Sequence, residues 1–159
     1  MKRLTALFLS IMMCVMCAAL TCCTKNPPAD PNAGTTDKTE DTDMKMNVKV
    51  GDKSFTATLE DNAATRELIN IMKEAPISIS MSDYSGFEKV GSLGRSLTTD
   101  NHQTTTSAGD IVLYNGNQIV MFYGSNSWSY TMIGKIDDLS GWKDALGSGD
   151  ITAEFTLAE

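Results

Sequence analysis

The sequence predicts a mainly β protein in which about eight strands form a closed barrel, with two short helices that cap it. Two observations predict this fold. Short apolar segments recur along residues 45–159, separated by turns rich in Gly, Asp and Asn, and only two segments have helical periodicity. Closure into a barrel also removes the exposed edges that so many short strands would otherwise present. An open sandwich of strands and helices is the competing arrangement.

Strands make up most of the predicted elements. Alternation of apolar with polar side chains is clearest in residues 77–82 and 151–157, so each of these strands has one face to bury. Asn115-Gly116 tolerates the positive φ of a tight hairpin between two segments that are apolar on both sides, and we expect a helix to cover that hairpin from outside. Residues 84–101 are less regular, and residues 102–107 have the polar composition of a flexible loop. The predicted strands are residues 46–50, 55–59, 77–82, 111–114, 118–123, 128–136 and 151–157.

Two helices interrupt the strands. Residues 64–75 carry a single apolar stripe, and Asp61 or Asn62 can cap the start of this helix. Residues 140–146 are expected to form a shorter helix capped by Ser140. Each helix has a face to bury, so each must lie against the barrel.

Residues 1–23 are not expected to belong to the fold. A short positive region precedes a long uncharged stretch that ends in small residues, which is the pattern of a secretory signal; a membrane-spanning helix is the alternative that its length barely allows. The run Leu20-Thr21-Cys22-Cys23 resembles the bacterial lipobox, in which the last cysteine receives lipid. Cys23 is therefore the expected lipid acceptor, with Cys22 as the second choice. An ordinary secreted protein, cleaved after a small residue, is the competing interpretation.

Composition separates a spacer from the domain. Residues 24–44 are polar and lack apolar periodicity, so we expect a solvated coil that averages roughly 25 Å from end to end. Residues 45–159 hold nine Lys and Arg against fifteen Asp and Glu, a net charge of −6, which argues against nucleic-acid binding. All four cysteines lie within residues 1–23, so the domain has neither a disulfide nor a thiolate nucleophile. We expect the protein in the cell envelope, facing the periplasm, because no acidic run follows the anchor.

Several stretches of the domain resemble the cyclophilins, and more closely the bacterial cyclophilin-like domains. Residues 84–91, 109–114 and 128–131 with 134–136 carry the resemblance, and residues 115–118 are similar to the cyclophilin Asn-Gly-Ser-Gln segment that enters a core strand. The resemblance covers nearly all of residues 45–159. It implies an eight-stranded barrel capped by two helices.

The resemblance implies only part of a peptidyl-prolyl isomerase site. Phe87 begins a segment similar to the family's Phe-His-Arg, but Lys89 replaces the arginine, and lysine lacks the planar fork of a guanidinium. Gln118 matches a groove glutamine, and Val120 falls where a pocket phenylalanine would be. Trp128 resembles the groove tryptophan, although the loop after it is shorter and the histidine beyond it has no counterpart. We therefore assign no catalytic residue.

Arg95 is an isolated cation in a glycine-rich loop of an acidic domain. In a cleft at the barrel mouth with Tyr84, Phe87, Trp128 and Tyr130, it could hold a carboxylate or stack on a ring. A surface arginine beside core aromatics is the alternative interpretation.

These observations predict a membrane-anchored lipoprotein whose domain binds a small molecule or peptide in an apolar cleft. The alternative function is a divergent prolyl isomerase that acts on exported proteins. Binding of a flavodoxin-type partner is a third hypothesis, because bacterial cyclophilin-like domains are sometimes found alongside flavodoxins. We expect no cofactor and no metal, because His102 is the single histidine and no ligand-type residues have metal spacing. The expected ligand-binding residues are Tyr84, Phe87, Lys89, Arg95, Gln118, Trp128 and Tyr130.

Lipidation gives the first test. Mass spectrometry of the membrane fraction should find a mature N-terminus at Cys23 that carries acyl chains, because these supply the apolar attachment at about 0.8 kcal/mol per buried methylene. Cys23→Ala should release the protein from the membrane, whereas Cys22→Ala should not. An unmodified mature N-terminus would overturn the lipoprotein interpretation.

Overall fold

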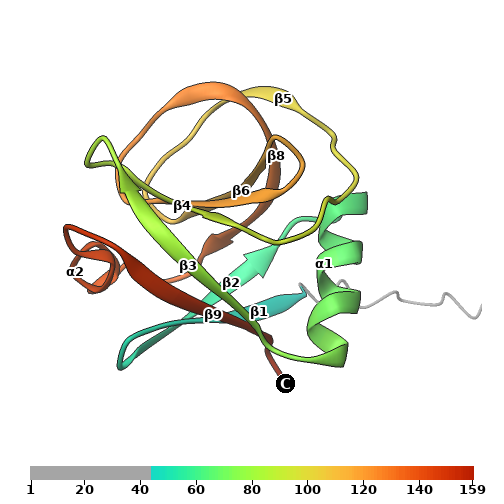
Figure 1. Cartoon of the computed structure of the whole chain (residues 1–159), viewed down its shortest axis with the longest axis horizontal. Helices are drawn as coiled ribbons and strands as arrows, with labels where there is room; N and C mark the ends of the chain where they lie inside the picture. The colour runs from blue at the N-terminus through green and yellow to red at the C-terminus, as the bar shows by residue number, and fades with distance from the viewer. Residues whose placement is uncertain (1–43) are drawn as a thin grey trace, which may run out of the picture. The chain divides into compact units, whose positions relative to one another are not determined.

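Nine strands and two helices make up residues 44–159, the part of the chain that the computed structural model describes (Figure 1). The predicted signal, lipobox and most of the spacer lie outside these residues. The helices are α1 (Ala63–Glu74) and α2 (Trp142–Leu146). The strands are β1 (Lys45–Val50), β2 (Lys53–Leu59), β3 (Ile77–Tyr84), β4 (Glu88–Ser92), β5 (His102–Thr105), β6 (Asp110–Tyr114), β7 (Gln118–Phe122), β8 (Ser127–Ile136) and β9 (Ile151–Leu157).

Eight of the strands close into an antiparallel barrel. Hydrogen-bonded neighbours follow the order β2-β1-β9-β3-β4-β7-β6-β8, and β8 then pairs with β2. Only three residue pairs close this ring, Ala57–Ile136, Thr58–Lys135 and Leu59–Gly134. The predicted closed barrel is confirmed, and the open sandwich is not what the chain forms.

The barrel interior and both helices share one hydrophobic core. Met46, Ile111 and Met121 point inward from three strands and are fully buried. Leu68 of α1 and Trp142 of α2 join the same core, and the two helices lie on opposite sides of the barrel (Figure 1). Burial of each large apolar side chain contributes about 1.5–3 kcal/mol. The barrel is therefore filled by its own side chains and leaves no channel for a ligand.

The two helices begin in different ways. Asn62, one of the two predicted caps, accepts a hydrogen bond at Oδ1 from the backbone N–H of Thr65 (3.0 Å). The predicted cap of the second helix is wrong. α2 follows Gly141, whose φ of 78° favours glycine, while the backbone N–H of Ser140 donates to Asp138 Oδ1.

Residues 102–107 also differ from the prediction of a flexible loop. His102 to Thr105 form β5, which pairs with the first half of β8 from His102–Tyr130 to Thr105–Ser127. The side chains of β5 are polar and mostly exposed, so no apolar pattern marks this strand. Its order comes from backbone pairing with β8, which the composition of the segment does not reveal.

The hairpin between β6 and β7 has the predicted turn but not the predicted cover. Asn115 and Gly116 both have positive φ, of 50° and 74°. The predicted helix over this hairpin is absent, since α1 packs chiefly against β9. The outer face of the hairpin instead carries a second apolar cluster, which consists of Val112, Val120, Phe122 and Tyr130.

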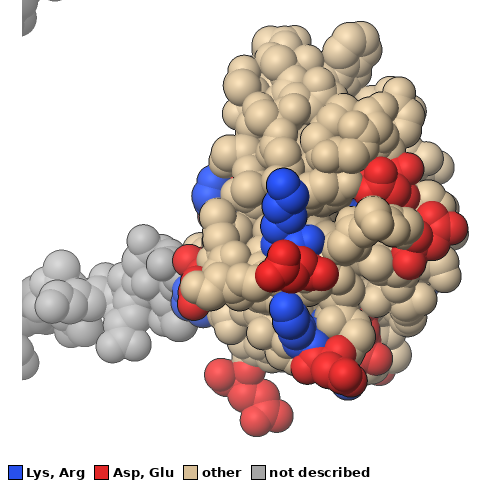
Figure 2. All heavy atoms as spheres, turned by 90° about the vertical axis from the view of Figure 1, so that its left-hand side faces the viewer, with Lys and Arg blue, Asp and Glu red and all other residues tan. Residues whose placement is uncertain are grey.

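Charged side chains are distributed unevenly over the domain. No Lys, Arg, Asp or Glu occurs between Asp110 and Lys135, a stretch that holds nearly all of β6, β7 and β8. On the face shown in Figure 2, acidic and basic residues gather in the middle and lower parts. The upper part, where β5 and β8 lie in Figure 1, is uncharged on that face.

Gly134 gives a test of barrel closure. A Cβ at this position would collide with the backbone carbonyl oxygen of Thr58 and lie 3.2 Å from Leu59 Cα, so Ala cannot fit without moving β2 away from β8. We expect Gly134→Ala to lower the free energy of unfolding by about 1–3 kcal/mol in urea titrations. Ser129→Ala, at an exposed position of the same strand, should change it by less than about 0.5 kcal/mol. Equal stability of the two variants would count against this account of closure.

Candidate functional site

A cavity of about 510 Å³ opens on the outer face of β4, β7, β6 and β8, beside the second apolar cluster. Its size falls within the range of small-molecule sites, roughly 300–1,000 Å³. Its lining combines four aromatic residues with two valines, a carboxylate and two amides. These residues are Tyr84, Glu88, Val90, Tyr114, Gln118, Val120, Asn126, Trp128 and Tyr130.

Strand alternation places the lining residues on one face. Val90 of β4 lies opposite Val120 of β7, and Tyr114 of β6 lies opposite Gln118 of β7. Residues one position away, such as Met121, point into the barrel core instead. The cavity is therefore built from the outward-facing halves of the same strands that fill the core.

Ring contacts and hydrogen bonds hold the inner wall of the cavity in place. Tyr130 is buried, and its ring meets Phe122 and Tyr114 edge to face at centroid distances of 5.7 and 6.0 Å. Its phenol oxygen accepts a hydrogen bond from Asn126 Nδ2 (3.0 Å). Asn126 Oδ1 in turn accepts from the backbone N–H of Ser127 (2.8 Å). The cavity wall is thus organised before any ligand arrives.

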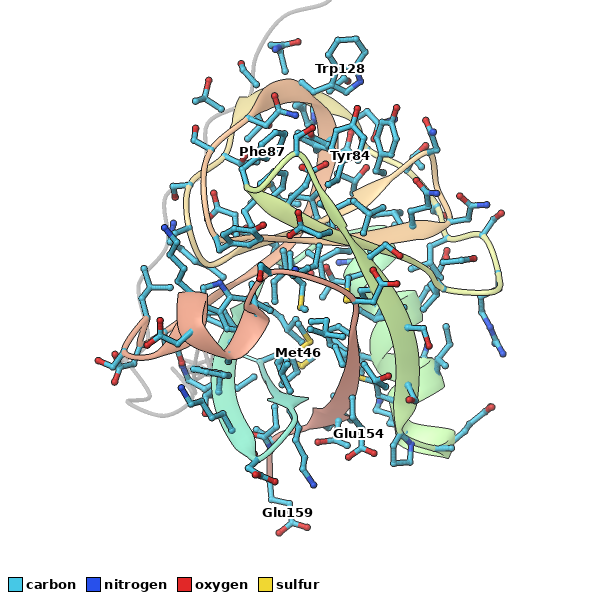
Figure 3. The ribbon with its side chains drawn as sticks, turned by 60° about the vertical axis from the view of Figure 1, so that its left-hand side comes forward. Met46, Tyr84, Phe87, Trp128, Glu154 and Glu159 are labelled. Carbon is cyan, nitrogen blue, oxygen red and sulfur yellow. The ribbon has the colours of Figure 1, made fainter. Side chains whose placement is uncertain are left out.

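The outer edge of the cavity is aromatic and open to solvent. Trp128 is 57% exposed and Tyr84 is 58% exposed, although large apolar side chains are usually more buried than this. Phe87 supports Tyr84 from behind, with the two rings edge to face at 6.1 Å. Figure 3 shows all three residues at the same end of the domain. These rings are available to contact a ligand.

Glu88 is the unusual group in the lining. It is only 6% exposed, and within residues 44–159 its Oε2 atom has no hydrogen-bond partner. Burial raises the pKa of this carboxyl group to about 7, because a charge is costly where water is excluded. Such a carboxylate lowers the stability of the folded protein, so stability alone would favour a neutral side chain at this position. Buried, unpartnered carboxylates in cavities are therefore typical of functional sites.

Lys89, the next residue, lies on the opposite face of β4. Its ammonium group is fully buried and donates to Asp83 Oδ1 (2.7 Å) and to the backbone carbonyls of Gly147 (3.0 Å) and Gly149 (2.7 Å). Hydrogen bonds from Lys89 and then from Tyr123 lower the pKa of Asp83. Lys89 thereby fastens the loop after α2 to β3 and β4, and it does not line the cavity.

The sequence matches the Cyclophilin-like family over residues 48–156, which is nearly the whole described domain. The chain belongs to the cyclophilin-like family. A solved structure of similar fold is the solution structure of the hypothetical protein AF2241 from Archaeoglobus fulgidus, with a TM-score of 0.54. That protein is 14% identical, and the match covers 73% of this chain and 95% of that one, so the likeness concerns the fold alone. Among curated proteins, none matches the sequence.

Four predicted site residues of the cyclophilin-like domain line the cavity, and three do not. The four in the lining are Tyr84, Gln118, Trp128 and Tyr130. Phe87 lies behind Tyr84 and packs on the second cluster. Lys89 is buried on the other face, and Arg95 is exposed in the loop between β4 and β5, outside the lining.

Sequence reasoning missed Glu88, Tyr114 and Asn126. A signal for Glu88 was present, because alternation along β4 places it on the same face as Val90. A carboxylate on an apolar strand face indicates a special environment. Glu88 lies opposite Tyr84 on β3 and Phe122 on β7, and β7 is far away in the sequence, so its burial could not be read from its neighbours alone.

Two further features concern the described part of the chain. Between residues 44 and 159, no helix has both the length and the apolar character needed to cross a bilayer. Nor does this region bring together three His, Cys, Asp or Glu side chains that could hold a metal ion.

Glu88 should make the stability of the domain depend on pH. Its carboxyl group has a pKa of about 7 in the folded chain and an ordinary value near 4.5 when unfolded, so folding favours the protonated form. That stabilisation is fully present below about pH 4.5 and is lost as the pH rises through 7. Glu88→Gln should therefore be more stable than the wild type at pH 8, by on the order of 2 kcal/mol, and equal to it near pH 4.

Urea titrations across this pH range measure the effect. Glu154→Gln is a matched control, because Glu154 is exposed on β9, outside the cavity lining, and its replacement removes the same charge. It should show no gain that grows with pH. A stability difference for Glu88→Gln that stays constant from pH 4 to pH 8 would contradict the burial of an ionisable carboxylate.

Proposed function

We propose that this protein is a membrane-tethered lipoprotein whose cyclophilin-like domain binds a small molecule or a short peptide segment in the outer cavity. One observation supports this most: a single cavity of about 510 Å³ combines an exposed aromatic edge with an unpartnered carboxylate. Binding sites typically pair apolar walls with a few convergent polar groups. The lipobox and spacer add the tether, which would hold the domain near the envelope on the periplasmic side.

The two sides of the cavity have different physical roles in this proposal. Trp128 and Tyr84 supply apolar area that is exposed in the free protein and that a ligand would cover. Tyr130 and Asn126 supply a wall already fixed by hydrogen bonding, so little side-chain entropy is lost on binding. Gln118 and Glu88 supply polar groups that can orient the ligand.

The alternative function, prolyl isomerisation, receives less support from the site. Gln118 lies in the cavity, but Lys89, which replaces the family's arginine, faces the other way. Among the described lining residues there is no Lys or Arg that could donate to an amide nitrogen. The geometry therefore favours binding over isomerisation.

Trp128 gives the test of this function. A thermal-shift screen of small molecules against the lipidated protein in a maltoside detergent should find stabilising ligands. Trp128→Ala should weaken their binding about tenfold, because a stacked ring contributes about 0.5–1.5 kcal/mol beyond its buried area. The melting temperature without ligand should stay nearly unchanged, since the ring is more than half exposed.

Leu139→Ala is the control for Trp128→Ala, because Leu139 is an exposed apolar residue outside the cavity lining. It should leave ligand affinity unaltered. A screen that finds no stabilising compound, together with no effect of Trp128→Ala on any candidate ligand, would refute the proposal.

A further inference from the structure

We propose that the cavity recognises an organic cation, specifically an ammonium group attached to an apolar body, with the Glu88 carboxylate as its counter-ion. This inference rests on the proposed function, that the cavity binds a ligand. It adds the chemical class of that ligand. Three observations support it: the missing partner of Glu88, the aromatic walls, and the uncharged surroundings.

The other buried ionisable residues between 44 and 159 have partners. Asp110, also 6% exposed, accepts hydrogen bonds from Lys135 Nζ (2.7 Å) and from the backbone N–H of Ser107 (2.7 Å). Lys89 donates to one carboxylate and two carbonyls. Among the described residues, only Glu88 keeps a buried side-chain oxygen without a hydrogen bond. A cationic ligand would supply the donor that the described chain does not.

The walls around Glu88 suit a cation. Tyr84, Tyr114, Trp128 and Tyr130 line the same cavity as Glu88 and come from β3, β6 and β8, so three strands supply its aromatic walls. The face of an aromatic ring is negative and attracts ammonium ions, most strongly where water is excluded. A carboxylate together with several such rings provides both charge and shape for an alkylammonium group.

Among the described lining residues of the cavity, no cation competes for Glu88. No Lys or Arg belongs to the described lining, and the chain is uncharged between Asp110 and Lys135. An anionic ligand would meet the charge of Glu88 without compensation, and a neutral ligand would leave that charge desolvated. The cavity therefore discriminates in favour of a positive ligand.

A matched set of probes tests the sign of the ligand charge. Phenethylammonium, 2-phenylethanol and 3-phenylpropanoate share a phenyl ring on a short chain and differ in carrying a positive, neutral or negative end. Calorimetry with the lipidated protein in a maltoside detergent at pH 8 should find the cation bound at least tenfold more tightly than the alcohol. The anion should bind most weakly.

Two glutamine variants locate the effect. Glu88→Gln should weaken phenethylammonium binding about tenfold and change 2-phenylethanol binding far less, because a hydroxyl can hydrogen-bond to either side chain. Glu154→Gln removes one exposed charge outside the cavity lining and should alter neither. Because Glu88→Gln is expected to be more stable than the wild type at pH 8, loss of binding cannot be ascribed to unfolding.

The pH dependence gives an independent readout. The other titratable groups near Glu88 are the phenols of the lining tyrosines and of Tyr123. Burial raises the pKa of Tyr123 to about 12. The Lys89–Asp83 pair lies on the opposite face of β4. Affinity for phenethylammonium should therefore rise from pH 6 to pH 8 as Glu88 ionises. The same measurement on Glu88→Gln should be flat.

The outcomes separate the two proposals. If 2-phenylethanol binds the wild type as tightly as the cation, or if Glu88→Gln leaves cation binding unchanged, the inference of a cationic ligand is overturned and the binding function stands. If no probe binds at millimolar concentration and Trp128→Ala has no effect on any ligand, both the inference and the binding function are overturned.

Discussion

The pairing of β2 with β8 is the constraint on which the rest of the structure depends. It joins the two ends of an eight-stranded sheet through three residue pairs, and it requires close backbone approach at Gly134. Once the sheet is closed, every strand residue faces either the interior or the outside. The interior is filled by side chains such as Met46 and Met121, so the proposed ligand would bind on the outer face.

Strand β4 shows how the inward or outward direction of a side chain determines its chemical environment. Glu88 and Lys89 are neighbours in sequence and point to opposite faces. Lys89 enters the closed side, where an acidic side chain and two carbonyls satisfy its charge. Glu88 faces outward, opposite Phe122 of the second apolar cluster, and its Oε2 has no partner within the described residues. A register shift of one residue would exchange the environments of Glu88 and Lys89. The pairing register of β4 therefore determines which charged group lines the cavity.

Local chemistry explains which elements could be predicted from the sequence. The hairpin turn at Asn115-Gly116 and the cap at Asn62 depend on residues next to one another, and both predictions are confirmed. Strand β5 was not predicted because its polar side chains show no alternation with apolar ones. The strand forms by pairing with β8, whose residues lie more than twenty positions further along the chain. The cap at Ser140 was wrong because Gly141 adopts the positive φ that precedes α2.

The site was predictable to the extent that its residues carry intrinsic chemistry. The sequence predicts Trp128, Tyr84 and Tyr130 as ligand-contacting aromatics; the structure places all three in the lining of one cavity, and their contact with a ligand stays a prediction. Glu88 was missed because alternation along β4 gives its face but not its burial, which also depends on β7, where Phe122 lies opposite it. Lys89 was selected from its match to an arginine of the family, but residue type does not specify the face of a strand.

Glu88 also links the stability of the domain to its selectivity. An unpartnered buried carboxylate destabilises the folded protein at neutral pH, because its charge is removed from water without a compensating hydrogen bond. In the proposed complex, a cation would supply both a hydrogen-bond donor and the opposite charge, whereas a neutral analogue of the same shape would supply at most the hydrogen bond. A buried polar group that needs a partner discriminates strongly against analogues that cannot supply one. Apolar contacts alone discriminate between analogues much less. The cost to the free protein and the preference for a charged ligand therefore have the same physical origin, and stabilising the domain by replacing Glu88 would remove the discrimination as well.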